Sequence, residues 1–125
     1  MINVKPILGI IGGSGVYEID GLQNTRWEKV SSSFGEPSDS LFFGELDGQK
    51  LVFLPRHGRG HRIPPSEINY RANIDSLKRA GVTDVISVSA VGSLKEDLVC
   101  LMLDTIPPLS PNHALSDGSY QIQKH

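Results

Sequence analysis

The feature that most constrains the fold of this chain is a predicted β-hairpin near its centre. The two arms, residues 41–46 and 49–54, are rich in Leu, Phe and Val, and Asp47-Gly48 lies between them. An Asp-Gly pair accepts the positive φ angles that a two-residue type I′ turn requires. The sequence therefore predicts two antiparallel strands joined by a tight turn.

A helix and a further strand are predicted after the hairpin. Apolar side chains recur at helical spacing over residues 67–80, and Gly81 is suited to the end of that helix. Residues 82–89 are β-branched and apolar, as in a buried strand, and a short apolar run also occupies residues 7–11. Hairpin, helix and buried strands together predict an α/β fold whose sheet has a parallel component.

Composition and charge limit the class of protein. The chain has 125 residues, 38% of them hydrophobic, which is enough for one domain but not for two ordinary ones. With 12 basic and 14 acidic residues, the net charge of -2 gives no general attraction to nucleic acid or to an anionic membrane. Cys100 is the only cysteine, and no apolar run approaches the roughly 18 residues of a membrane helix. We therefore expect a cytoplasmic protein that binds neither nucleic acid nor membrane.

Three loops that follow predicted strands carry small or cationic residues. They are Gly12-Gly13-Ser14-Gly15, the segment 55–63 with the basic cluster RHGRGHR, and Ser89-Ala90-Val91-Gly92-Ser93. Ligands of open α/β sheets bind where strands end. Small residues let backbone N–H groups form a concave nest for an anion, and a guanidinium matches two phosphate oxygens at once. The three loops together predict a shared site for a small anion.

Each motif alone also has an ordinary structural explanation. Gly-Gly-Ser-Gly is more often a flexible turn, and it lacks both the Gly-Lys-Ser/Thr of a nucleotide P-loop and the pattern of a dinucleotide-binding loop. His57 and His61 have the spacing of a metal site on a helix, but Gly58 and Gly60 argue against a helix there, so we expect no metal. One basic cluster without interleaved aromatic residues does not favour nucleic-acid binding.

Four stretches of the chain resemble the methylthioadenosine phosphorylase branch of the purine nucleoside phosphorylases. In order, they are GIIGGSG, PSDSLFFGELDG, RHGRGHRIPPSEINYRANIDSLKRAGV and VSAVGSLKEDL, and the resemblance covers residues 7 to about 98. It implies the N-terminal part of a nucleoside phosphorylase fold, a mixed sheet flanked by helices, which is incomplete here. It further implies phosphorolysis of 5′-methylthioadenosine or a related purine nucleoside to free purine and 5-methylthioribose 1-phosphate or ribose 1-phosphate. Inorganic phosphate would be a co-substrate, no cofactor is implied, and an intact relative would be a homotrimer.

The resemblance also implies roles for individual residues. Ser14 matches the hydroxyl donor to phosphate, Arg56 and His57 match the cationic pair that holds it, and Ser89 with Ala90 matches the floor of the phosphate site. Each role agrees with the chemistry of the three loops. The resemblance assigns no catalytic residue within this part of the family's sequence.

The resemblance ends after Leu98, where the family has a Pro-Gly turn and another apolar strand. We therefore expect residues 1–98 to form a partial nucleoside phosphorylase domain and residues 99–125 to form an irregular tail. Truncation, or a shifted reading frame entered near Val99, explains this tail better than a real shortened family member does. The edge of the strand at 82–89 would then be open to foreign pairing. An alternative function follows, in which the chain is a non-catalytic fragment that retains at most a phosphate-binding half-site.

Overall fold

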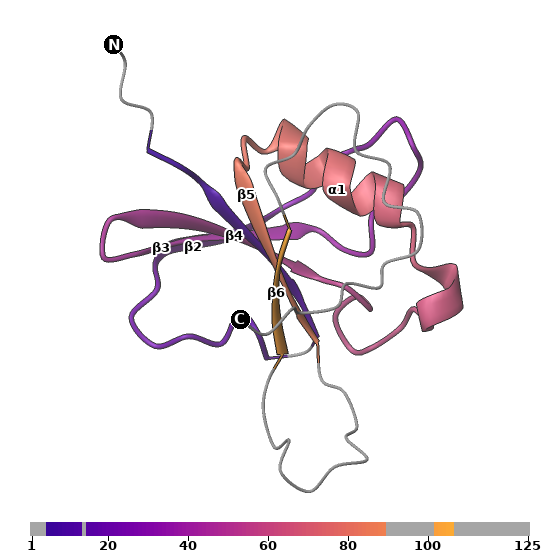
Figure 1. Cartoon of the computed structure of the whole chain (residues 1–125), viewed down its shortest axis with the longest axis horizontal. Helices are drawn as coiled ribbons and strands as arrows, with labels where there is room; N and C mark the ends of the chain where they lie inside the picture. Colours follow the sequence, from indigo (N-terminus) through magenta and orange to yellow (C-terminus); the bar gives the residue numbers. More distant parts are fainter. Residues whose placement is uncertain (1–4, 14, 90–101, 107–125) are drawn as a thin grey trace, which may run out of the picture.

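The computed structural model describes residues 5–13, 15–89 and 102–106 of the chain, and these form one mixed sheet and one α-helix (Figure 1). The strands are β1 (Leu8–Gly12), β2 (Gln23–Glu28), β3 (Leu41–Leu46), β4 (Gln49–Pro55), β5 (Asp84–Ser89) and β6 (Met102–Ile106). Their order in the six-stranded sheet is β2-β3-β4-β1-β5-β6. β1 pairs in parallel with both β4 and β5, and the other pairs are antiparallel. The predicted α/β fold with a mixed sheet is confirmed.

The hairpin lies where the sequence predicts it. β3 and β4 pair antiparallel up to Leu46 and Gln49, and Asp47 and Gly48 have φ angles of 50° and 79°. Both turn residues are therefore in the left-handed region that a type I′ turn requires. β4 extends one residue further than predicted, to Pro55, which places the basic cluster immediately after the strand.

The helix α1 (Tyr70–Arg79) begins three residues later than predicted, after a short 3₁₀ turn at Pro65–Glu67. The side-chain oxygen of Asn69 accepts a hydrogen bond from the backbone N–H of Ala72 at 3.1 Å, and so caps the helix. The predicted start at residue 67 was wrong because Asn69 provides the cap of the α-helix. Gly81, with a φ of 91°, follows the helix as predicted.

The hydrophobic core lies between α1 and one face of the sheet. Leu77 of α1 is fully buried, and it belongs to one cluster with residues from β1, β3, β4 and β5 and from the segment before β5: Ile11, Leu41, Val52, Leu54, Val82 and Val85. Burying a Leu side chain is worth roughly 1.5–3 kcal/mol. The central strands β1 and β4 are therefore firmly held, and they position the loops that follow them.

Two strands were not predicted. β2 is polar and mostly exposed, with Trp27 as its only half-buried residue, so it lacks the alternating pattern by which strands are recognised. β6 pairs antiparallel with β5, from Val85 opposite Ile106 to Ser89 opposite Met102. The prediction of an irregular tail therefore does not hold for Met102–Ile106, and the edge of β5 that we expected to be open is covered. Residues 99–101 and 107–125 lie outside the described residues.

Candidate functional site

The carboxyl ends of three neighbouring parallel strands meet at one edge of the sheet. β1 lies between β4 and β5, and the pairing brings Gly12 opposite Pro55 and Ile11 opposite Ser87. The three loops singled out from the sequence therefore begin side by side. Ser89 is the last residue of β5, whereas Ser14 and Ala90 lie outside the described residues.

Arg56 links the three strand ends. Its backbone N–H donates to the carbonyl oxygen of Gly12 at 2.9 Å, and its guanidinium Nη2 donates to the carbonyl oxygen of Val88 at 3.1 Å. The side chain thus extends from the end of β4 to β5, the second strand along. Among the described residues, no carboxylate forms an ion pair with Arg56. Because a guanidinium has five N–H donors, this half-buried cation retains donors for an anion.

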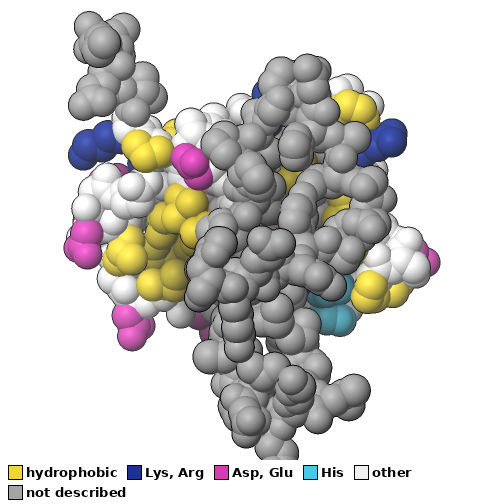
Figure 2. Space-filling model, viewed as in Figure 1, with side chains coloured by type: hydrophobic (Ala, Val, Ile, Leu, Met, Phe, Trp, Pro, Cys, Tyr) yellow, Lys and Arg dark blue, Asp and Glu magenta, His cyan; other side chains and the backbone are white. Residues whose placement is uncertain are grey.

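His57 is held by its own loop. Its Nδ1 lies 3.0 Å from the carbonyl oxygen of Ile63, and the backbone N–H of Ile63 donates to the carbonyl oxygen of His57 at 2.9 Å. A carbonyl only accepts, so Nδ1 carries the proton and Nε2 is the nitrogen left for a ligand. The ring of His61 stacks on that of His57, with the centroids 4.3 Å apart. Histidine side chains reach the molecular surface seen in Figure 2.

The loop between these histidines is a series of tight turns. Gly58 and Gly60 have φ angles of 72° and 75°, and His61 also has a positive φ, of 56°. The N–H of Gly58 donates to the carbonyl of Pro55, and the N–H of His61 donates to that of Gly58. This backbone is not helical, as the two glycines indicated. Within the part of the chain that the structure describes, no three His, Cys, Asp or Glu residues form a group that could hold a metal ion.

Asp39 fixes the outer side of the same loop. Its carboxylate accepts hydrogen bonds from the backbone N–H of Arg59 at 2.7 Å and from the Arg59 guanidinium at 3.0 and 3.1 Å. The Arg62 guanidinium lies 3.5 Å from it, and only 3% of the Asp39 side chain is exposed. Burial alone would raise the pKa of Asp39, but the hydrogen bonds from Arg59 and from the N–H of Ser40 outweigh it and hold the pKa below its ordinary value.

An aromatic cluster packs against the guanidinium of Arg59. The guanidinium lies 4.0 Å from the ring centroid of Trp27, and Trp27 packs against Tyr17 and Phe42 at centroid distances of 5.3 and 4.8 Å. Tyr17 belongs to the loop after β1, so the cluster joins the outer sides of two of the three loops. Neither Asp39 nor Trp27 was predicted from the sequence as part of the site. Asp39 is 20 residues from Arg59, and no spacing rule connects residues that far apart.

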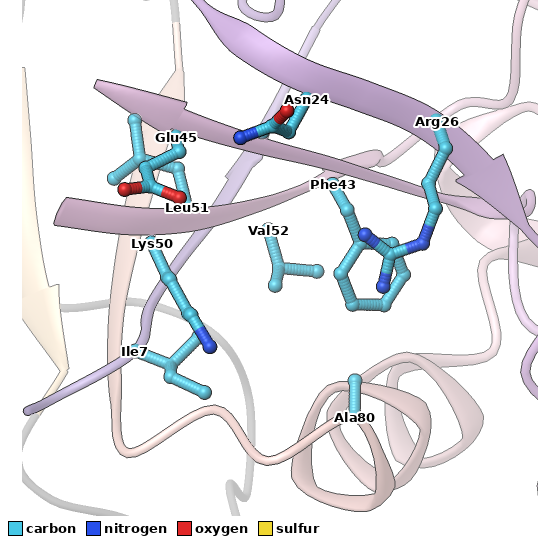
Figure 3. A pocket seen from close by; sticks show the side chains of 10 residues that line it. Ile7, Asn24, Arg26, Phe43, Glu45, Lys50, Leu51, Val52 and Ala80 are labelled. Carbon is cyan, nitrogen blue, oxygen red and sulfur yellow. The ribbon is translucent and has the colours of Figure 1, made fainter. Parts of the chain in front are cut away.

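A separate hollow of about 180 Å³ lies elsewhere on the molecule (Figure 3). Its lining includes the apolar Ile7, Phe43, Val52 and Ala80 together with Arg26 and Lys50. The Arg26 guanidinium lies 4.3 Å from the centroid of the Phe43 ring. Ile7 precedes β1 and Gly12 ends it, so the hollow lies toward the opposite end of β1 from Arg56. Of the predicted phosphate-binding residues that the structure describes, none lines it.

The comparisons with known proteins agree with the fold. The family model of the phosphorylase superfamily matches residues 7–101. The S-methyl-5′-thioadenosine phosphorylase of Rhodospirillum rubrum is 66% identical over 94 residues, which are 75% of this chain and 32% of that protein. The protein of the same name from Cereibacter sphaeroides is 58% identical over 95 residues, 76% of this chain and 33% of the relative. The chain belongs to the phosphorylase superfamily.

Solved structures lead to the same conclusion. A methylthioadenosine phosphorylase from an antarctic soil metagenomic library superposes with a TM-score of 0.69 at 53% identity, covering 74% of this chain and 32% of that one. The methylthioadenosine phosphorylase of Schistosoma mansoni in complex with adenine has a TM-score of 0.68 at 48% identity, covering 76% and 34%. The fold is the N-terminal part of the nucleoside phosphorylase fold. The chain spans about a third of the length of these relatives. No helix among the described residues is long and apolar enough to cross a membrane.

Proposed function

We propose that this chain supplies the phosphate-binding part of an enzyme that cleaves 5′-methylthioadenosine, or a related purine nucleoside, by phosphorolysis. An oxygen of inorganic phosphate forms a bond to C1′ of the sugar, and the bond from C1′ to the purine nitrogen breaks. The electron pair of that bond stays on the purine, which takes up a proton. The products are free purine and 5-methylthioribose 1-phosphate or ribose 1-phosphate, and the reaction uses no cofactor.

The position of Arg56 is the observation that carries this proposal. Its backbone joins the end of β1 and its guanidinium reaches the end of β5, so a phosphate beside it would be within reach of all three loops. A planar guanidinium can bind two of the four phosphate oxygens at once, which helps to orient another for attack. The second group we assign to phosphate is Nε2 of His57, since Nδ1 donates to the carbonyl oxygen of Ile63. In this tautomer Nε2 is an acceptor, and it would accept a hydrogen bond from the O–H group of hydrogen phosphate.

The remaining ligands that we propose lie at the ends of β1 and β5. Gly12 and Gly13 are followed by Ser14, whose hydroxyl we assign as a donor to phosphate, and β5 ends at Ser89, which we assign together with Ala90. Phosphate held in this way is both nucleophile and electrostatic partner. Its negative charge would stabilise the positive charge that develops on the sugar, and correct positioning would lower the barrier further.

The experiment uses a chain in which residues 1–98 are joined to the part of the Rhodospirillum rubrum relative that lies beyond the match. We expect this chimera to release adenine from 5′-methylthioadenosine only when phosphate is present. Equal release in phosphate-free buffer would refute phosphorolysis. The chimera carrying Arg56→Ala is the control for contaminating host enzyme.

For the completed chain we also propose a homotrimer in the cytoplasm that acts on small molecules and binds neither nucleic acid nor membrane.

The fraction of the relatives that is matched favours a second candidate function. Because the match covers 32% of the Rhodospirillum rubrum enzyme, the 125 residues could bind phosphate without transferring it to a sugar. General-acid help contributes about 10²- to 10⁴-fold to such a rate, and positioning can add more, so a site lacking both would show no turnover. Phosphate binding by the 125-residue chain without adenine release would support this candidate. Adenine release by that chain, abolished by Arg56→Ala, would exclude it.

A further inference from the structure

We propose that Asp39 is a positioning residue for the phosphate loop, here defined as residues 55–63. It acts by holding Arg59 so that Arg56 and His57 keep the arrangement that binds phosphate. This inference rests on the proposed function, because it assumes that phosphate binds beside Arg56. Asp39 would not contact the phosphate directly, because both groups are anions.

The contacts of Asp39 fix the backbone of the loop as well as a side chain. One carboxylate oxygen accepts both the backbone N–H and the Nε–H of Arg59, and the other accepts from Nη2. Hydrogen bonds to charged groups are stronger than neutral ones, and the paired geometry adds orientation. Arg59 is three residues from Arg56 and two from His57, so its backbone position constrains the turns that carry both.

Asp39 is itself held by the core of the domain. The preceding residue, Ser38, donates its backbone N–H to Oδ1 of Asn73 at 2.8 Å, and Asn73 donates through Nδ2 to the Ser38 hydroxyl at 2.9 Å. Both residues are buried, and Asn73 is on α1. A Cβ atom placed on Gly58 would lie 3.1 Å from the carbonyl oxygen of Ser38, so the loop packs directly on this segment. The contacts thus run from α1 through residues 38 and 39 to the phosphate loop.

Because Asp39 is negatively charged, the inference can be tested by whether phosphate affinity rises or falls when this charge is removed. A carboxylate near an anion site disfavours anion binding through space, and neutralising it leaves the Arg59 cation without its partner. If charge alone mattered, Asp39→Asn would strengthen phosphate binding. If Asp39 positions the loop, the same substitution weakens phosphate binding, because Arg59 loses its bidentate partner and the turns after Arg56 become less constrained.

The experiment titrates inorganic phosphate into the 125-residue chain by isothermal titration calorimetry. We expect Asp39→Asn to bind phosphate about tenfold more weakly, a size typical of coupling between linked sites. The matched control is Asp75→Asn, which removes the same charge from a carboxylate that hydrogen-bonds Ser32 and the Arg79 guanidinium and not the loop. Phosphate affinity should be unchanged in this control.

A spectroscopic measurement separates positioning from general damage. In the unaltered chain the backbone amide resonance of Arg59 should follow the ionisation of Asp39 in acid, and in Asp39→Asn this titration should disappear. Arg59→Lys provides a second variant that keeps the net charge. Charge alone predicts unchanged phosphate binding by this variant, whereas loss of the bidentate pair predicts binding weaker by about twofold to fivefold.

Two results distinguish this inference from the proposed function. If Arg56→Ala removes phosphate binding while Asp39→Asn and Arg59→Lys bind phosphate as well as the unaltered chain or better, the inference is wrong and the phosphate site stands. If Arg56→Ala binds phosphate normally, the proposed site is wrong. Should Asp39→Asn fail to fold, Arg59→Lys alone decides, because unchanged phosphate affinity in that variant overturns the positioning role.

Discussion

Arg56 and Arg59 lie on the same loop, three residues apart, and their surroundings differ in almost every respect. Arg59 forms a bidentate pair with the buried carboxylate of Asp39 and lies over the ring of Trp27. Arg56 has no carboxylate partner among the described residues and extends across the sheet edge to the carbonyl of Val88. One arginine is neutralised within the fold, and the other presents its charge where three strands end.

The difference between these two arginines shows that a basic cluster identifies an anion-binding site only when the carboxylates that pair with its members are known. The sequence RHGRGHR contains three arginines with similar neighbours along the chain. The structure separates them, because Asp39 accepts from Arg59 and lies near Arg62 but is not paired with Arg56. Substitutions at the two sides of the loop should therefore differ in size and kind. Arg56 variants should lose phosphate binding directly, whereas Arg59 variants should lose loop stability and, through the loop, a smaller part of the phosphate affinity.

The largest expected effect is that of Arg56→Ala on phosphorolysis by the completed chimera. Removing a preorganised donor to developing or transferred charge costs about 10²- to 10³-fold in rate, and we expect at least this loss in kcat/KM for phosphate. The thermal midpoint should change little, since Arg56 donates only one side-chain hydrogen bond to a described residue. Steady-state kinetics with phosphate as the varied substrate, together with a thermal scan, measures both.

Arg56→Lys is the sharper companion to that variant. An ammonium keeps the charge but cannot reproduce the bidentate fork, so KM for phosphate should rise while KM for the nucleoside stays the same. Unchanged KM for phosphate and unchanged kcat would remove Arg56 from the site, and the contrast with Arg59 would then disappear.

The next effect is the response of the Arg59 side of the loop to acid. The hydrogen bonds of Asp39 hold its pKa below the ordinary value of 3.8. The ionised carboxylate therefore stabilises the folded state at pH values above 3.8. This stability is lost as the pH falls through the lowered pKa of the folded state. Trp27 is the only tryptophan in the chain and lies under Arg59, so its fluorescence should change below pH 3.8.

Asp39→Asn is the control for this acid titration. In that variant the component of the Trp27 signal assigned to Asp39 should be absent, while any change caused by other carboxylates remains. Identical acid titrations of Trp27 fluorescence in the two proteins would show that Asp39 does not hold Arg59 against the ring in solution.

The smallest expected effect is that of removing the cation–π contact itself. Trp27→Leu should reduce the free energy of unfolding by about 0.5–1 kcal/mol for the lost Arg59 contact, in addition to the cost of lost packing against Tyr17 and Phe42. Urea unfolding measures this value. KM for phosphate in the chimera should change little, since the hydrogen bonds from Arg59 to Asp39 remain in this variant. A large rise in that KM would mean that the Trp27 ring, and not Asp39, holds Arg59 in place.

The sequence predicted the elements that carry strong local signals. Asp47-Gly48 specifies its own turn, and the helical spacing before Gly81 identifies α1, although the cap at Asn69 moved its start. β2 was not predicted because its residues are mostly exposed and their hydrophobicity does not alternate. β6 was not predicted because nothing in its local sequence indicated pairing with β5. Tertiary pairing, and not local preference, determines both strands.

Only the parts of the candidate site that are recognisable from neighbouring residues in the sequence could be predicted. Small and cationic residues at strand ends indicated the three loops and named Arg56 and His57. Asp39 and Trp27 act from distant segments, and their contacts with Arg59 depend on how β2 and the segment before β3 fold onto the loop. Which of two similar arginines is neutralised was therefore beyond what the spacing of residues could show.

The central claim is that phosphate binds at the strand edge around Arg56 and not in the separate hollow beside Lys50. The most direct test is a phosphate titration of the 125-residue chain, labelled with ¹⁵N and followed by the amide resonances of each residue. We predict that the resonances of Gly12, Gly13, Arg56 and Ser89 shift together and saturate with one Kd, while that of Lys50 beside the separate hollow stays still. Saturable shifts confined to residues around that hollow, or no saturable shift at the four strand-edge residues, would contradict the account.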